Sequence, residues 1–184
     1  MTLEPREFLT KMEKRMLFND EDKATLQANA DWGKQIAPEM TEHFYAFLNR
    51  DEEMANILNQ KDGRMDRLRA TFTEWFSEMF TGIDNWGDAY AVRRWRIGLV
   101  HVKLGIGPQH VVPAMATVVR EVNNKIEADG KDVGINNALK KICMIDLAFI
   151  EQAYVEVSSS AVRQETGWSE ALFKRMIATG SNSM

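Results

Sequence analysis

The sequence contains few cysteines and histidines, and this shortage limits the kinds of metal site that it can form. A single cysteine, Cys143, excludes an intramolecular disulfide and suits a reducing compartment, so we expect a cytoplasmic protein. The histidines are His43, His101 and His110, and none lies at ligand spacing from Cys143 or from another histidine. Because protein zinc sites need three or four ligands, this inventory argues against zinc and favours a cofactor held by one histidine.

The chain also lacks dense basic runs and long apolar runs. Its net charge is −4, and no basic patch stands out, so we do not expect nucleic acid as the main partner. No stretch approaches the length of a membrane span, and the segment 1–16 mixes charged with apolar residues, unlike a signal peptide. The length of 184 residues, with 45% hydrophobic residues, predicts one domain with an ordinary core.

Apolar residues recur every three or four positions along most of the chain, and no alternating strand pattern is present. We therefore predict an all-α fold. The start signals predict a first helix opened by Pro5, a second capped by Asn19 and running through Ile36, and a third opened by Pro38. Asp51 starts a short fourth helix, and a fifth ends at Thr81-Gly82.

The sequence also predicts a sixth, a seventh and an eighth helix. The sixth is capped by Asp84 or Asn85 and carries His101, and the seventh is opened by Pro108. The eighth runs from about Ile135 to beyond Tyr154 and is apolar over more than one face, which is typical of a helix that is buried on several sides or shared with a partner.

The domain boundaries follow from these elements. We expect an N-terminal extension helix over 1–18, a main domain over 19–165, and a short helix with a disordered end over 166–184. About eight helices with one histidine on the sixth suggest the globin arrangement, in which helices cross steeply around a haem pocket.

His101 is the most informative residue of the chain. It lies in the last turns of its helix, and Ile97, Val100 and Leu104 lie beside it at helical spacing. Such apolar surroundings suit one axial bond to the iron of haem. From this window alone the alternative remains a hydrogen-bonded structural histidine, which is the commoner role.

Candidate residues for the opposite wall lie on the third and fifth helices. Tyr45 offers one O–H, and a bound gas with partial negative charge would gain about 1–3 kcal/mol from it. Leu68 and Thr71 share a helix face, and Thr71 adds a second hydroxyl. Each residue has an alternative role. Tyr45 could lie at the boundary of the core with its hydroxyl in water. The hydroxyl of Thr71 could bond to the backbone of its own helix, and the spacing favours this role for Thr71.

Four motifs in order resemble the globin-coupled sensor family, the bacterial sensor globins. They are an Arg-x-x-Ile-Gly-x-x-His-x-x-x-Gly-Ile segment at 94–106, the Phe44-Tyr45 pair, an Arg-Leu-x-x-Thr segment at 67–71, and Asp146 with Ala153-Tyr154. The similarity covers about residues 19–157. One departure is His110-Val111-Val112, where the family often has an aromatic pair, so we do not expect a proximal tyrosine switch and expect His110 at the surface or at a helix start.

The resemblance implies haem b with His101 as the proximal ligand and Tyr45 as the main donor to bound oxygen. The residues expected around the haem are His101, Tyr45, Leu68, Thr71, Phe44, Ile97 and Leu104. It also implies a homodimer through the last two long helices. Arg93, Arg94 and Arg96 are candidates for the haem propionates, but a solvated helix face is the favoured assignment for at least two of them.

The resemblance further implies a sensor of O2, with CO and NO as related ligands, that signals through its dimer interface or a separate output domain. No output domain is visible before Met184, so we expect either an isolated sensor module or a single-domain sensor globin. We do not expect an enzyme, apart from a minor nitric oxide dioxygenase or peroxidase activity. The alternatives are a haem globin enzyme that detoxifies nitric oxide or a haem globin that stores O2, and a haem-free interaction scaffold.

Overall fold

The structure, a computed structural model, describes residues 3–59 and 63–180. Within these residues the fold contains helices and no strand, which confirms the all-α prediction. The elements are α1 (Pro5–Met16), α2 (Asp20–Ala28), α3 (Ala30–Leu48), α4 (Glu52–Leu58), α5 (Arg64–Thr81), the 3-10 turn η1 (Gly82–Asn85), α6 (Asp88–Leu104), α7 (Pro108–Ala128), α8 (Val133–Thr166) and α9 (Glu170–Gly180).

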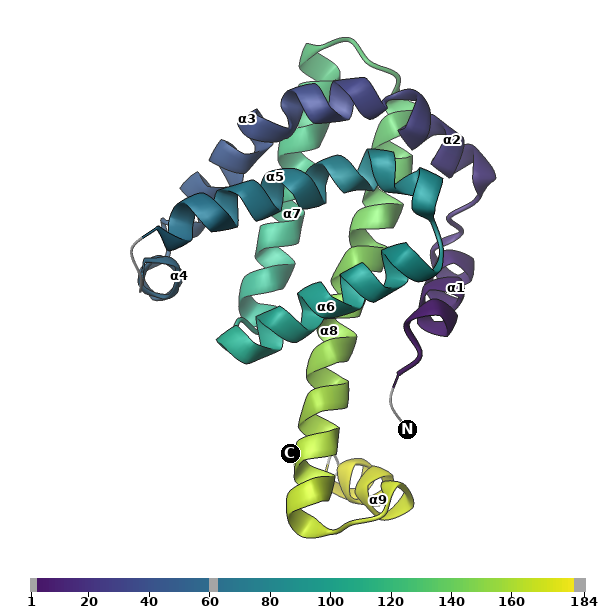
Figure 1. The fold of residues 1–184 in the computed structure, drawn as a ribbon, viewed down its shortest axis with the longest axis vertical. Helices are drawn as coiled ribbons and strands as arrows, with labels where there is room; N and C mark the ends of the chain where they lie inside the picture. Colours follow the sequence, from purple (N-terminus) through teal and green to yellow (C-terminus); the bar gives the residue numbers. More distant parts are fainter. Residues whose placement is uncertain (1–2, 60–62, 181–184) are drawn as a thin grey trace.

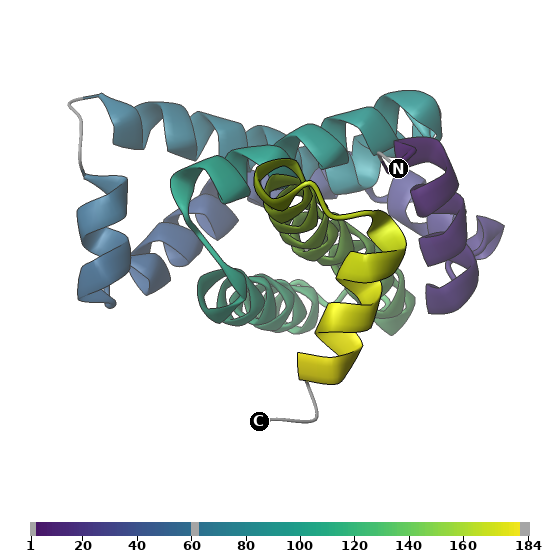
Figure 2. The same cartoon turned by 90° about the horizontal axis from the view of Figure 1, so that it is seen from below.

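The helices cross at steep angles, as expected for the globin arrangement. Figure 1 shows α7 and α8 along the long axis of the molecule, with α3 and α5 running across one end and α6 crossing lower down. The view from below in Figure 2 shows α7 and α8 nearly end-on, with α4 and α1 at opposite sides. The long helices α3, α5, α6, α7 and α8 therefore surround a common interior.

Several predicted helix boundaries are confirmed. The side chain of Asn19 accepts a hydrogen bond from the backbone N–H of Asp22, and the side chain of Asp22 accepts one from the backbone N–H of Asn19. Helix α2 therefore begins with a complete capping box. Asp51 caps α4 through the Met54 N–H at 2.9 Å, and Pro108 is the first residue of α7. These signals act through local hydrogen bonds, which explains why the sequence alone reveals them.

The predicted role of Pro38 is wrong. The break between the second and third helices occurs at Asn29, and Pro38 lies inside α3. Proline removes one hydrogen bond to the carbonyl four residues earlier, which here belongs to the exposed residue Lys34 and is open to water. Ala37 and Met40 on either side are buried in the core, so packing outweighs the loss of that bond.

The predicted start of the sixth helix is also wrong. Asp84 and Asn85 belong to the turn η1, and α6 begins at Asp88 after Gly87, which has a φ of 130°. Trp86 stays outside the helix because its indole N–H donates to Glu13 at 2.7 Å and its ring packs against Tyr90. The contact with Glu13 is long-range, so no local sequence signal indicates where α6 starts.

Helix α8 has two different halves. Its first part, from Ile135 to Ala153, is enclosed by α1, α2, α5, α6 and α7 of the same chain, which accounts for its apolar residues on several faces. The part after Tyr154 extends beyond the other long helices and ends beside α9 (Figure 1). The short tail helix is confirmed as α9, while the predicted disordered end lies, from residue 181 onward, outside the described residues.

Gly98 brings α6 very close to α8. A Cβ atom at this position would lie 2.8 Å from the carbonyl oxygen of Phe149 and 2.9 Å from the Cβ of Ala153. Only glycine permits this approach without displacing backbone. His101, one turn further along α6, is thereby held at a fixed distance from α8.

Among the helices that the structure describes, none is both long enough and apolar enough to cross a bilayer.

Candidate functional site

A cavity of about 320 Å³ lies between α3, α4, α5, α6 and α7, with Ile150 of α8 contributing to its wall. This volume is at the lower end of the range found for small-molecule and cofactor sites. The structure brings all seven residues that the sequence analysis selected to this one cavity: His101, Tyr45, Leu68, Thr71, Phe44, Ile97 and Leu104. They come from three helices, so the cavity is a tertiary feature.

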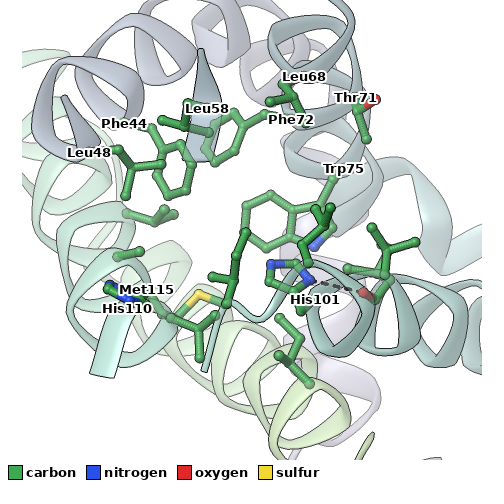
Figure 3. A pocket seen from close by; sticks show the side chains of 18 of the residues that line it. Phe44, Leu48, Leu58, Leu68, Thr71, Phe72, Trp75, His101, His110 and Met115 are labelled. Atoms are coloured by element: carbon green, nitrogen blue, oxygen red, sulfur yellow. Dashed lines mark hydrogen bonds between the residues drawn. The ribbon is translucent and has the colours of Figure 1, made fainter. Parts of the chain in front are cut away.

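The imidazole of His101 is fixed in one orientation. Its Nδ1 lies 2.9 Å from the carbonyl oxygen of Ile97, and the dashed line in Figure 3 marks this bond. A carbonyl oxygen only accepts, so Nδ1 carries the hydrogen and Nε2 carries the lone pair. Nε2 has no hydrogen-bond partner among the described residues. Such a nitrogen is ready to bind a metal.

The environment of His101 keeps its ring neutral. Burial lowers the pKa of His101 below its usual value, while the Ile97 carbonyl opposes this shift. The backbone is held as well, because the hydroxyl of Tyr154 on α8 donates to the His101 carbonyl oxygen at 3.1 Å. A neutral, immobile imidazole is the form that a metal ligand needs.

Aromatic rings form the wall opposite α7. Phe44 of α3 stacks on Phe72 of α5 with ring centroids 4.2 Å apart, and Phe72 in turn contacts Trp75. Trp75 and His101 line the same cavity, and both are labelled in Figure 3. The indole N–H of Trp75 donates to Asp146 at 2.9 Å, away from the cavity. This wall of the cavity is therefore aromatic and apolar.

Tyr45 brings an unpaired hydroxyl to this wall. The residue is buried, and its hydroxyl has no hydrogen-bond partner among the described residues. Burial raises the pKa of Tyr45 to about 12, with a small opposing effect from Arg69. At neutral pH the side chain therefore keeps its proton and offers one O–H donor.

Thr71 and Leu68 differ from Tyr45 in what they offer. The Thr71 hydroxyl donates to the carbonyl oxygen of Arg67 at 2.8 Å, and the residue is exposed, although it lines the cavity. A hydroxyl has one hydrogen, so Thr71 in this rotamer has none left for a ligand. Leu68 is partly buried and supplies only apolar surface.

The three arginines of α6 occupy three different environments. Arg94 is buried and ion-paired with Asp146, with Nε 2.8 Å from Oδ2, so its candidacy for a haem propionate is wrong. Arg93 lines the cavity but pairs with Glu74 and Glu78, each at 2.8 Å. Arg96 is exposed, lines the cavity and has no ion-pair partner among the described residues.

His110 is not a surface residue. It occupies the third position of α7, as a helix-start residue does, but its ring is buried against the cavity. The reason is the direction of α7, whose first turns face inward toward α4. Helix spacing could not indicate this burial, because α4 and α7 are distant in the chain.

Sequence reasoning missed a second group of apolar residues around the cavity. They come mainly from α4 and α7 and include Met54, Leu58, Val111, Met115 and Val118. Most of them belong to predicted apolar stripes, so the sequence indicated burial. The sequence pattern did not indicate whether each buried side chain packs against other side chains or lines the cavity.

The lining residues are suited to binding. The cavity contains apolar surface, a neutral imidazole nitrogen, an unpaired phenol and an exposed arginine. Among the described residues, the lining contains no serine, cysteine or carboxylate. This set of groups fits a large, flat, apolar ligand that carries a metal.

Comparison with known proteins agrees with this geometry. A family model described as Protoglobin matches residues 7–160. Among solved structures, the fold is similar to the globin domain of the Geobacter sulfurreducens globin-coupled sensor, with a TM-score of 0.71 and 24% sequence identity over 79% of this chain and 96% of that chain. No curated protein sequence matches.

Proposed function

We propose, on the premise that the chain belongs to the protoglobin family, that its cavity holds haem b and that the protein senses oxygen. The family implies haem binding. The observation that carries the proposal for this chain is the lone pair of His101 Nε2, which faces an apolar cavity while Nδ1 is fixed by Ile97.

The residues present fit the cofactor. Haem, when bound, supplies an iron atom that binds diatomic gases reversibly. His101 would hold the iron, and Phe44, Leu68, Ile97 and Leu104 would exclude water from the ring of the cofactor. Arg96 is the side chain available for a propionate, since Arg93 and Arg94 are already paired.

Tyr45 would provide the polar contact for the gas. Its O–H has no competing partner among the described residues, and its raised pKa keeps it protonated. A hydrogen bond to an atom with partial negative charge favours O2 over CO, because CO develops less charge when bound. Thr71 is a weaker candidate in this role while its hydroxyl bonds to Arg67.

Signalling requires that His101 be coupled to a second site. The carbonyl of His101 accepts from Tyr154, and Gly98 contacts the backbone of α8, so any shift of this part of α6 acts on α8. The far half of α8 exposes Val155, Val157 and Val162. We propose that α7 and α8 form the homodimer interface through which the sensor reports, with any output domain supplied separately.

Absorption spectra of the purified protein test the proposal. Wild-type protein reconstituted with haem should show the intense haem band and distinct ferrous, oxygenated and carbonyl forms. His101→Ala should lose the spectrum of a histidine-ligated haem, and His43→Ala, which removes a half-exposed histidine outside the cavity, should retain it. A wild-type protein that takes up no haem, or an unchanged His101→Ala spectrum, would refute it.

A further inference from the structure

A second group of ligand atoms lies at the contact between the start of α4 and the start of α7. It consists of carboxylate oxygens of Asp51 and Glu53 and a ring nitrogen of His110, and these three atoms lie within 4.8 Å of one another. Both carboxylates are exposed, and the imidazole is buried. The group is separate from His101, which lies on α6.

The nitrogen Nε2 of His110 has no hydrogen-bond partner among the described residues. The side chain is only 7% exposed, so water does not compensate freely for this. Its nearest acceptor, Oε2 of Glu53, is 3.5 Å away, beyond the usual length of an N–H···O bond. A buried nitrogen left in this state costs free energy, so its position needs an explanation.

The spacing suits two ligands of one ion. Ligand atoms that each lie about 2.0–2.1 Å from a tetrahedral zinc ion are roughly 3.3 Å apart, close to the 3.5 Å between His110 and Glu53. Asp51 uses Oδ1 to cap α4 through Met54, which leaves Oδ2 for a metal. Because both carboxylates are exposed, small rotations of their side chains complete the approach.

We propose that Asp51, Glu53 and His110 bind a divalent transition-metal ion, with Zn²⁺ as the best match. One nitrogen and two oxygens supply three protein ligands, and water completes the tetrahedron. The imidazole disfavours Mg²⁺ and Ca²⁺, which prefer oxygen ligands only. The sequence argument against zinc counted cysteine and histidine, and it missed carboxylates brought close by the fold.

The position of this site gives it a structural consequence. Met54 and Leu58 of α4 and Val111 and Met115 of α7 line the large cavity. An ion held by Asp51, Glu53 and His110 would join these two walls directly. Occupancy of the site would then stabilise the cavity wall, whether or not haem is present.

Zn²⁺ titration by calorimetry tests the proposal, using the full-length protein as purified after treatment with a chelator. We expect one equivalent of Zn²⁺ to bind. Glu53→Gln and Asp51→Asn should each weaken binding at least tenfold. Both positions are exposed, and asparagine also caps helix starts, so α4 should keep its N-cap in Asp51→Asn. His110→Gln should abolish binding, with circular dichroism to confirm that it folds.

His43→Gln is the matched control. His43 also has a carboxylate nearby, with Nδ1 3.4 Å from Glu121 Oε2, but it is half-exposed and belongs to no group of three candidate ligands in the described part of the chain. Its substitution should leave the affinity unchanged. If wild type binds no Zn²⁺, or if Glu53→Gln binds as wild type does, His110 and Glu53 form an ion pair only and the proposal is refuted. The readout is independent of haem, so it can fail while the proposed gas-binding function holds.

Discussion

Two polar regions lie on the same helix, about two turns apart, and they differ in whether charged partners surround their nitrogen atoms. Nη2 of Arg94 has no hydrogen-bond partner among the described residues, but two carboxylates pair with the guanidinium. Around Arg94, charge is matched: Arg94 pairs with Asp146 and Glu78, and Asp146 accepts from Tyr90 and Trp75 at 2.7 and 2.9 Å. Around His101, one nitrogen stays unpaired beside a cavity. The first arrangement is typical of a structural core, and the second of a binding site.

Trp75 joins the two regions. Its N–H belongs to the Arg94 cluster, which we define as Arg94, Asp146, Glu78, Tyr90 and Trp75, while its ring forms part of the cavity wall. The cluster therefore sets the position of a surface that the proposed haem would contact. Breaking the two regions separately should distinguish a loss of fold from a loss of ligand.

The largest expected effect comes from Asp146→Ala. Arg94 is 1% exposed and Asp146 is 2% exposed, so the substitution leaves a buried guanidinium without its nearest counter-charge. Loss of one partner of a buried ion pair costs about 3–5 kcal/mol. We expect the free energy of unfolding, measured by urea denaturation, to fall by this amount.

Asp129→Ala is the matched control for that prediction. Asp129 also accepts from an indole, that of Trp32 at 2.8 Å, and also pairs with a cation, Lys125, but it is 30% exposed. Because water screens exposed pairs of this kind, we expect the free energy of unfolding to fall much less in this variant than in Asp146→Ala. Equal losses in the two variants would contradict the distinction drawn between buried and exposed pairs.

Gly98→Ala should affect both regions at once, because Gly98 lies between Arg94 and His101 on α6. The new methyl group would meet the Phe149 carbonyl at 2.8 Å and force α6 from α8. Overpacking of this kind costs about 1–3 kcal/mol. We expect a lower melting temperature together with an altered haem spectrum. A change in stability with an unchanged spectrum would show that His101 is positioned independently of this contact.

A smaller and purely local effect is expected from Tyr45→Phe. The ring stays in place while the unpaired O–H is removed, so stability should change little. Oxygen should dissociate about tenfold faster in stopped-flow measurements, which corresponds to the loss of one hydrogen bond. Thr71→Val should dissociate oxygen at nearly the wild-type rate because that hydroxyl bonds to Arg67. The reverse ranking would assign the donor role to Thr71.

The smallest expected effect is a dependence of the free energy of unfolding on pH. Burial holds the pKa of His101 below the usual value of about 6.5, so the unfolded chain takes up a proton at a higher pH than the folded one. The free energy of unfolding should therefore decrease as pH falls below about 6.5. Urea denaturation at about pH 7.5 and about pH 5.5 measures this change. Between these two pH values, the free energy of unfolding should decrease less in His101→Gln than in the wild type. An equal decrease in both proteins would assign the effect to other groups.

Much of the fold could be predicted because its signals are local. The cap at Asn19, the cap at Asp51 and the opening proline of α7 act within one helical turn. The predictions failed where a distant contact decides the outcome, as with Trp86, whose indole bonds to Glu13, and with Pro38, which the packing of α3 tolerates. The resemblance to sensor globins is confirmed at the level of family and fold.

For the candidate site, the sequence selected residues that the structure gathers around one cavity, because a motif preserves the spacing along each helix. It placed His110 correctly at a helix start but gave no sign that the His110 ring is buried or that Arg94 pairs with Asp146, since helix spacing gives a direction only relative to that helix. Whether an arginine meets solvent or Asp146 depends on a helix some fifty residues away.

The sequence by itself determined the helical class, most helix starts and the apolar surroundings of His101, because these depend on neighbours within one or two turns. Tertiary structure alone decided which polar atoms are paired and which are left facing a space. Pairing requires groups from different helices to meet within about 3 Å, and only the packing of those helices brings them there.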